Sequence, residues 1–212
     1  MSGQVTEGAK GPAHRPSKRT GVIEAAIKVF AARGFADASI PEIAEAAELA
    51  PTGVYYHFAT KDELFDSVVR QVYSAVDAVV EQARPYDEPG GPDALLATIE
   101  AVWSWASSHP DHAKILYQQM PDSTPASRVM RQEHEQRHVE RAYGYLDESS
   151  SELTRVSAAE SHAAATLTVR TLIRFQIATL AAVVPGGALE DRSVASVRAE
   201  LDRVSQRLVY GS

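Results

Sequence analysis

The stretch that most constrains the fold of this chain is SIPEIAEAAELAPTGVYYHF, residues 39–58. Ser39 and Glu42 have the spacing of a capping box, which predicts that a helix begins here. The chain is then predicted to turn before Pro51, which can open a second short helix that ends near His57. Two short helices joined by a tight turn form a helix-turn-helix.

The second helix of this motif carries side chains suited to contact DNA. In a helix-turn-helix it lies in the major groove, and its first turn contacts base edges. Small and polar residues occupy that turn, and hydroxyl and imidazole groups that can bind phosphate oxygens follow. Lys61 begins the next helix, where free amide groups can help it to hold a phosphate. The predicted DNA-contacting residues are Ser39, Pro51, Thr52, Gly53, Tyr55, Tyr56, His57 and Lys61.

A longer segment, RGFADASIPEIAEAAELAPTGVYYHFATKDEL at residues 33–64, closely resembles the DNA-binding domain of the tetracycline-repressor (TetR) family. The features that carry the resemblance are the Arg33-Gly34-Phe35 turn, the Ile43-Ala44 pair, the Tyr-x-His-Phe signature that ends at Phe58, and Lys61. The resemblance covers roughly the first third of the chain, and the remainder fits the general plan of the family. A helical hairpin in an unrelated all-α core is the alternative.

Two positions differ from the family pattern. Glu48 stands where the family usually has a turn glycine, a residue that adopts positive φ without strain. Ala50 replaces the usual serine or threonine, so the second helix is predicted to lack a side-chain N-cap. The two differences together are expected to cost about 1 kcal/mol of stability.

The resemblance implies an all-α fold, with an N-terminal three-helix helix-turn-helix DNA-binding domain and a C-terminal helical domain for ligand binding and dimerisation. Residues 1–16 are then a disordered basic arm, residues 17–62 the DNA-binding domain and residues 63–212 the effector-binding and dimerisation domain. It also implies a repressor that binds a palindromic DNA operator as a homodimer and is released by a small, largely apolar effector. Two alternatives stay open: the protein activates transcription instead, or its N-terminal domain serves only for contacts with other proteins.

The charge pattern fits binding to DNA through a limited surface. The net charge is −7. The N-terminal arm nevertheless carries an excess of cations, Lys10, Arg15, Lys18 and Arg19 against Glu7. A DNA duplex repels an acidic protein except near this arm and the second helix of the helix-turn-helix. We therefore expect that the affinity for DNA falls steeply as the salt concentration rises. An inert tail is the alternative for the arm.

Composition excludes several classes of protein. The absence of cysteine excludes disulfides, thiolate metal sites and cysteine nucleophiles. No apolar run precedes Gly21, so no signal peptide is expected. The longest apolar stretch contains Arg170 and Arg174, which argues against a membrane span. We therefore expect a cytoplasmic protein with no membrane partner and no cofactor.

Helical spacing of apolar residues predicts helices on both sides of the motif and five more beyond it. Their predicted ranges are residues 17–32, 60–84, 93–108, 111–119, 126–148, 152–183 and 190–210, with a loop at 85–92. The resemblance implies that the long helix at 60–84 is a mechanical link, whose tilt sets the distance between the two DNA-binding heads.

The resemblance also implies an effector cavity among the helices of residues 93–183. Aromatic, flexible or cationic residues there are the candidates to line it: Trp103, Tyr117, Met120, Met130, Tyr143, Arg170, Arg174 and Phe175. Most such side chains in a helical domain belong to the core. The two arginines lie one turn apart, and they can bind an anionic group of an effector or pair with carboxylates of a neighbouring helix.

His134-Glu135-x-x-His138 matches HExxH, which suggests an alternative function as a zinc metallopeptidase. Two histidines at i and i+4 can bind one metal ion. Helical spacing, however, puts both histidines roughly opposite the apolar face of their helix, and neighbouring arginines oppose a dication. We therefore expect a solvated polar face, with no metal, no catalytic residue and no enzymatic activity; a partner contact or an incidental metal contact is left open.

The last two predicted helices fit a dimer interface. The helix at 152–183 is apolar nearly all round after residue 163, so it must be covered on more than one side. The final helix carries apolar residues at alternating three- and four-residue spacing, Val194, Val197, Leu201, Val204 and Leu208. Pairing with a symmetric copy would make a four-helix interface. The alternative is that both helices pack only on their own subunit.

Overall fold

The computed structural model describes residues 18–84, 91–117, 124–147, 158–183 and 187–210, and within these ranges the chain is all-helical, as predicted. The helices are α1 (Lys18–Asp37), α2 (Ile40–Ala46), α3 (Pro51–His57), α4 (Lys61–Ala83), α5 (Pro92–Ser108), α6 (Pro110–Tyr117), α7 (Pro125–Asp147), α8 (Ala158–Val183) and α9 (Val194–Tyr210). The predicted arm and most of the predicted 85–92 loop lie outside the described residues.

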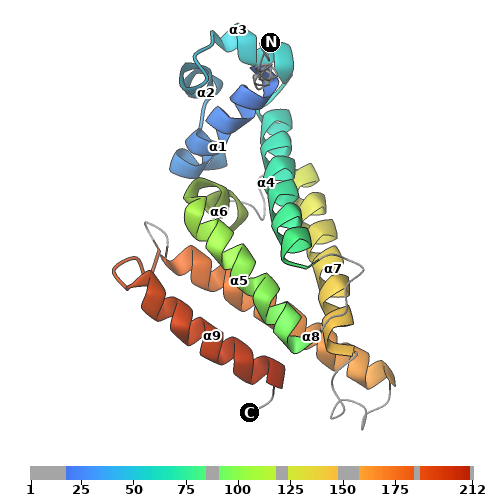
Figure 1. Cartoon of the computed structure of the whole chain (residues 1–212). Helices are drawn as coiled ribbons and strands as arrows, with labels where there is room; N and C mark the ends of the chain where they lie inside the picture. Colours follow the sequence, from blue (N-terminus) through green and yellow to red (C-terminus); the bar gives the residue numbers. More distant parts are fainter. Residues whose placement is uncertain (1–17, 85–90, 118–123, 148–157, 184–186, 211–212) are drawn as a thin grey trace, which may run out of the picture.

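The helices form a small head and a larger body joined by α4. Figure 1 shows α1, α2 and α3 at one end and α5, α8 and α9 at the other, with α4 running from the head into the body beside α7. The short α6 lies between the two parts and packs against α1. Its Ile115 is completely buried in the core of the head, so the head and the body share apolar contacts.

Aromatic rings fill the core of the head. Phe30, Phe58 and Phe65 are buried. Phe65 of α4 packs edge-on against Phe30 of α1 with ring centroids 5.1 Å apart, and Phe35 lies 4.7 Å from Phe65. Such aromatic pairs stabilise a core beyond the area that they bury. The core therefore fixes the start of α4 to the helix-turn-helix.

The capping box that the sequence predicts at α2 is present. The Glu42 amide donates to Ser39 Oγ, and the Ser39 amide donates to Glu42 Oε2 at 2.9 Å. The hydrogen bonds from Ser39 lower the pKa of the Glu42 carboxyl, with the Arg33 guanidinium at 3.2 Å acting in the same direction. These contacts define where α2 begins.

Glu48 occupies the position that the sequence marks as strained. Its φ is 57°, in the left-handed region. The Glu48 amide donates to the Glu45 carbonyl, and the Leu49 amide donates to the Ala44 carbonyl at 2.9 Å. This pair of hydrogen bonds is a Schellman motif, in which glycine is the preferred residue at the left-handed position. Glu48 therefore adopts a conformation that costs a non-glycine residue about 1–2 kcal/mol.

Lys61 has a structural role that the sequence did not suggest. Gly34 interrupts α1 with a φ of 83°, so carbonyl groups at the end of α1 are left without helical partners. The Lys61 ammonium donates to the carbonyl oxygens of Phe35, Ala36 and Ala38 at 2.8–3.1 Å. It therefore caps the end of α1 in this structure rather than reaching outward to a phosphate.

Polar contacts hold α4 and α7 together along their length. At the start of α7, the Thr124 hydroxyl donates to Asp66 Oδ1 at 2.5 Å. Further along, Arg141 pairs with Glu81 at 2.8 Å. The apolar side of α4 is formed by buried residues that run on from the head into the body, Leu64, Phe65, Val68, Val69, Val72, Val76 and Val80. Within the described residues, no helix is both long enough and apolar enough to span a membrane.

We predict that Glu48→Gly stabilises the protein. Relief of the left-handed strain is offset in part by the greater backbone entropy of glycine in the unfolded chain, so the expected gain is about 0.5–1 kcal/mol. Urea unfolding followed by circular dichroism measures it. The control, Glu45→Gly at an exposed position in the regular part of α2, is expected to lose a similar amount. Equal effects at both positions would contradict the assignment.

Removing the Lys61 ammonium is predicted to destabilise the head. Lys61→Met keeps the aliphatic stem but leaves three carbonyl groups without their charged donor, so we expect a loss of about 1–2 kcal/mol in the free energy of unfolding. Lys28→Met, at an exposed position of α1, is the matched control and is expected to have little effect. Chemical denaturation of both variants gives the comparison; equal stability of Lys61→Met and the wild type would disprove the capping role.

Candidate nucleic-acid interface and effector cavity

Most of α3 faces outward from the head. Tyr55 is 53% exposed and Tyr56 is 85% exposed. Pro51 and Thr52 are also exposed, whereas Val54 is completely buried and anchors the helix to the core. An exposed short helix on a rigid apolar base is the arrangement that lets side chains enter a DNA groove.

The remaining predicted contact residues lie in less open positions. Gly53 and His57 are half-buried, and the His57 ring packs edge-on against Tyr56 at 5.1 Å. The Ser39 hydroxyl donates to Glu42 Oε2 at 2.7 Å, so it acts within the capping box. Ala50, the N-cap of α3, makes no side-chain capping bond, as its sequence predicts. The surface available to DNA is therefore centred on Thr52, Tyr55 and Tyr56.

The body contains a partly open cavity of about 520 Å³. One side is apolar and comes mainly from α4, α5 and α8. The other side comes from α7 and carries polar and charged groups. Residues that line it include Tyr73, Val76, Leu95, Thr98, Ile99, Val102, Trp103, His134, Glu135, His138, Arg174, Ile177 and Leu180. A largely apolar cavity with a polar wall is the usual form of a small-molecule site.

The structure places the predicted pocket residues in several environments. Trp103 and Arg174 line the cavity. Met130 packs against the core of the head, and Phe175 packs with the buried cluster around Trp103, so both act in cores instead. Arg170 forms an ion pair with Glu135 at 3.1 Å, one of the alternatives for this arginine. Met120 and the side chains of Tyr117 and Tyr143 lie outside the described part of the chain.

Sequence reasoning missed most of the aliphatic cavity wall. Ile99 and Val102 lie on the predicted inner face of α5, and Val76 on that of α4, but a helical pattern does not distinguish core from cavity lining. Both surfaces are apolar and turned away from solvent. The difference arises because the neighbouring helices do not fill the space between them.

The histidines of the HExxH segment do not lie on a solvated face, so that prediction was wrong. His134 is only 9% exposed and His138 is half-buried. Each Nε2 atom lies 3.1 Å from Asp77 Oδ1 on α4, and the two Nε2 atoms are 3.0 Å apart. The prediction failed because α7 packs against α4 as well as against α8, and the histidines lie on the side that α4 covers.

Burial and hydrogen bonding set the charge states of this cluster. Burial acts to raise the pKa of Asp77, but the hydrogen bonds with His134 and His138 outweigh it and hold the pKa well below its usual value. Burial lowers the pKa of His134 despite its hydrogen bond to Asp77, and the nearby Arg137 charge also lowers it. At neutral pH the group therefore contains an ionised carboxylate and a neutral His134 imidazole.

Glu135 is not placed to act as the base of a peptidase. Its carboxylate forms ion pairs with Arg174 at 2.7 Å, Arg170 at 3.1 Å and Arg131 at 3.7 Å. A peptidase of the HExxH type needs this glutamate to take a proton from metal-bound water. Three guanidinium groups instead hold it as a link between α7 and α8.

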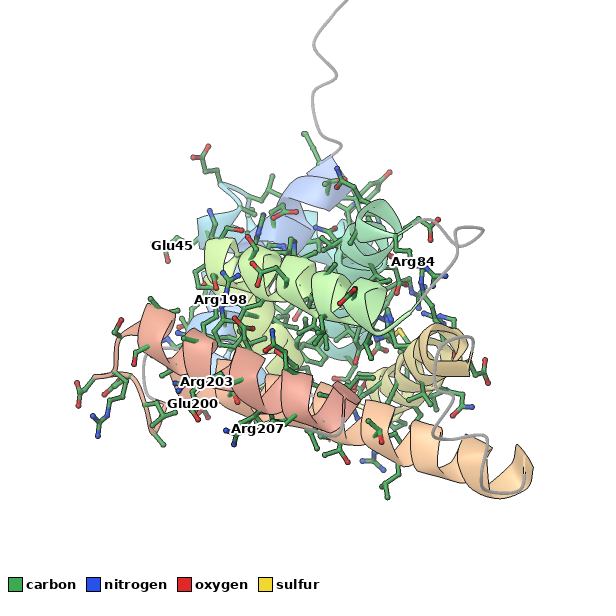
Figure 2. All side chains as sticks on the ribbon, turned by 60° about the horizontal axis from the view of Figure 1, so that its bottom comes forward. Glu45, Arg84, Arg198, Glu200, Arg203 and Arg207 are labelled. Carbon is green, nitrogen blue, oxygen red and sulfur yellow. The ribbon has the colours of Figure 1, made fainter. Side chains whose placement is uncertain are left out.

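The residues of α9 that were predicted to form the dimer interface lie partly in the core of their own chain and partly on its surface. Leu201 is only 2% exposed and packs with Trp103, Ala106 and Leu180 of its own chain, so its assignment to a subunit interface was wrong. Val197 and Val204 are half-buried. Val194 and Leu208 are 45% and 40% exposed. Figure 2 shows α9 at the front of the molecule, with Arg198, Arg203 and Arg207 labelled along it.

α8 packs against α9, and one side of α8 is left exposed to solvent. Gln176 donates to Ser205 Oγ at 3.3 Å in the buried contact between the two helices. On α8, Leu167 is 68% exposed, and Thr171, Arg174 and Ala178 are exposed at the spacing of a single helical stripe. The expectation that α8 is covered on more than one side is met within one chain, because α5, α6, α7 and α9 all pack against it, and the exposed stripe is the side that stays open.

Sequence comparison finds a match to a known family within the head. Residues 22–68 match the model of bacterial regulatory proteins, tetR family. The HTH-type transcriptional repressor NicS of Pseudomonas putida is 30% identical over 98 residues, which is 46% of each chain. The chain spans about half the length of the curated relatives that it matches.

Solved structures share the fold along nearly the whole chain. A TetR-like transcriptional regulator from Rhodococcus sp. RHA1 has a TM-score of 0.72 at 23% identity, over 95% of this chain and 100% of that one. AibR with isovaleryl coenzyme A and operator DNA has a TM-score of 0.71 at 15% identity, over 91% and 98%. FadR from Bacillus subtilis with stearoyl-CoA has a TM-score of 0.70 at 18% identity, over 91% and 98%.

These comparisons agree with the helix-turn-helix and with the arrangement of head, linking helix and body. The family model covers the helices that carry the exposed α3 surface. The likeness to solved structures extends that agreement to the fold of the body. Residues 22–68 therefore match the tetR family of bacterial regulatory proteins, and the chain as a whole shares the fold of solved TetR-like regulators.

Proposed function

We propose that this chain is a transcriptional repressor that binds a palindromic operator as a homodimer and is released by a small, largely apolar effector. The observation that carries the proposal is the connection of the exposed α3 surface to the body cavity through α4. Phe65 near the start of α4 lies in the core of the head, and Val76 further along lines the cavity. A ligand that displaces one end of a stiff helix also moves the other.

The proposed complex is a symmetric dimer because one head is too small to recognise an operator by itself. A single short recognition helix contacts few base pairs, so a dimer with two heads about one helical turn apart is needed for useful specificity. The open stripe of α8 around Leu167 and Ala178 supports an isologous interface that α9 completes through Val194 and Leu208. Leu201 takes no part in this interface because it is buried in its own subunit.

The effector class that we infer for the cavity is an acyl thioester, with its apolar acyl chain inside the cavity. The aliphatic wall formed by Val76, Ile99 and Val102 suits an acyl chain, and Thr98 and Gln176 provide polar groups beside it. Two structural neighbours were solved with acyl-CoA ligands, one short and one long, which supports the same class. The cavity volume of about 520 Å³ is within the usual range for small-molecule sites.

Contacts from α3 are predicted to divide into base and phosphate contacts. After an operator is selected from a random duplex library, Thr52→Ala should change which bases are preferred, with a cost of about 1–3 kcal/mol at the affected position. Tyr55→Phe should weaken binding nearly uniformly, by the about 0.5–1.5 kcal/mol of one hydrogen bond, and leave the salt dependence unchanged. Fluorescence anisotropy at several salt concentrations measures both effects.

Gln132→Ala, at an exposed position of α7 in the body, is the control and should bind like the wild type. Unaltered binding by both α3 variants would reject α3 as the recognition helix. An operator affinity that does not change with salt would reject the proposed mode of binding as a whole.

A substitution that fills the cavity is predicted to leave DNA binding intact and to abolish release by the effector. In the wild type, acyl-CoA thioesters of increasing chain length should weaken operator binding at least about tenfold, equivalent to about 1.4 kcal/mol. Ile99→Trp places a large ring in the cavity, so it should keep operator binding and lose the response to the thioester. Val129→Trp adds the same ring at an exposed position of α7 and should still respond. Equal responses of the two variants would exclude this cavity as the effector site.

A further inference from the structure

We propose that Asp77, His134 and His138 form a binding site for a divalent transition-metal ion of the zinc class, in the wall between α4 and α7. The ligand atoms are His134 Nε2, His138 Nε2 and Asp77 Oδ1, all within 4.8 Å of one another. Two imidazoles and one carboxylate are a donor set that binds Zn²⁺ with a further position left open. The inference does not depend on the proposed DNA-binding function.

The distances between the three atoms fit a bound ion without rearrangement. They are 3.0, 3.1 and 3.1 Å. An atom at the centre of such a triangle lies about 1.8 Å from each corner, so an ion about 1 Å above the plane reaches all three at about 2.0–2.1 Å, a usual length for zinc–nitrogen and zinc–oxygen bonds. The ligands therefore occupy one face of the ion, and its opposite face stays open to water or to a ligand.

Protons alone do not satisfy these contacts. A neutral imidazole nitrogen carries either one proton or one lone pair, directed along a single line in the plane of the ring. If both Nε2 atoms donate to Asp77 Oδ1, two N–H groups converge on one oxygen with their nitrogens only 3.0 Å apart; if one donates to the other, a lone pair faces the carboxylate. A cation at the centre removes this conflict because all three atoms then act as electron-pair donors.

The surroundings orient the ligands. The Tyr73 ring stacks on His134 with centroids 4.0 Å apart, which holds the imidazole plane. Asp77 Oδ2 accepts a hydrogen bond from Arg137 at 3.3 Å, and this leaves Oδ1 directed at the histidines. Such outer contacts are a regular part of metal sites in proteins.

The positive charges near the histidines do not oppose a metal ion as strongly as the sequence suggests. Arg137 pairs with Asp77, Arg141 pairs with Glu81 at 2.8 Å, and Arg131 interacts with Glu135. Each guanidinium group thus contacts a carboxylate, although Arg131 shares Glu135 with Arg170 and Arg174, and Arg137 shares Asp77 with the proposed ion. The electrostatic objection to a dication is therefore weakened by the packing of α7 against its neighbours.

The site has access from two sides. Both histidines line the body cavity. His138 and Asp77 also line a second hollow of about 420 Å³ between α4 and α7. An ion can enter through the outer hollow, and its open coordination position can face a ligand held in the cavity. Because its ligands come from α4 and α7, a bound ion also stabilises this packing of the two helices.

The test measures metal binding by the full-length, tag-free protein without DNA or effector. We expect isothermal titration with Zn²⁺, Ni²⁺ and Co²⁺ after chelator treatment to give one saturable site per chain. The melting temperature should rise with the concentration of the metal. The absorption bands of bound Co²⁺ should report nitrogen and oxygen ligation.

Asp77→Asn keeps the shape and hydrogen-bonding capacity of the side chain but removes its charge. It should weaken binding by more than the about 10–100-fold that the loss of an outer contact costs. His138→Gln should do the same, and circular dichroism in the presence of chelator shows whether each variant is folded. His109→Gln removes an exposed histidine outside the cluster and should bind as the wild type does. Absence of a saturable site, or equal affinity in wild type and both cluster variants, would overturn the proposal.

Discussion

The packing of α4 is the constraint on which the rest of the structure depends. Its first turns place Leu64 and Phe65 in the core of the head, and Val76 and Val80 continue the same apolar side into the body cavity. One helix therefore lies in the core of the head and also in the wall of the body cavity. Because a helix of 23 residues is stiff, this shared element links the exposed α3 surface mechanically to the body cavity.

Polar groups give the contact between α4 and α7 its specificity. Apolar packing alone would tolerate several rotations of α7, since aliphatic side chains interdigitate in many ways. Three groups of polar contacts, at Asp66, Asp77 and Glu81, select one arrangement. Buried polar atoms are costly when they are unpaired, so a different rotation of α7 would leave several of them without partners. This arrangement turns the HExxH histidines toward α4.

The HExxH segment shows that a sequence motif does not by itself make an active site. The HExxH spacing brings two histidine nitrogens together, as local helical geometry requires. The glutamate of the motif, however, is bound by three arginines, and the third ligand comes from a helix that no part of the motif specifies. The same five residues that would serve a peptidase here join α7 to α4 and α8.

The sequence by itself determined the features that depend on neighbours a few residues away. These include the capping box at Ser39, the uncapped start of α3 at Ala50, the left-handed position at Glu48 and the extent of α4. Only the tertiary structure decided that Lys61 caps α1, that Leu201 is buried in its own subunit and which aliphatic residues line a cavity. It also brought Asp77 to histidines some 60 positions away, 61 in the case of His138. Backbone and capping rules act within one or two turns, whereas the choice of packing partner depends on how whole helices fit together.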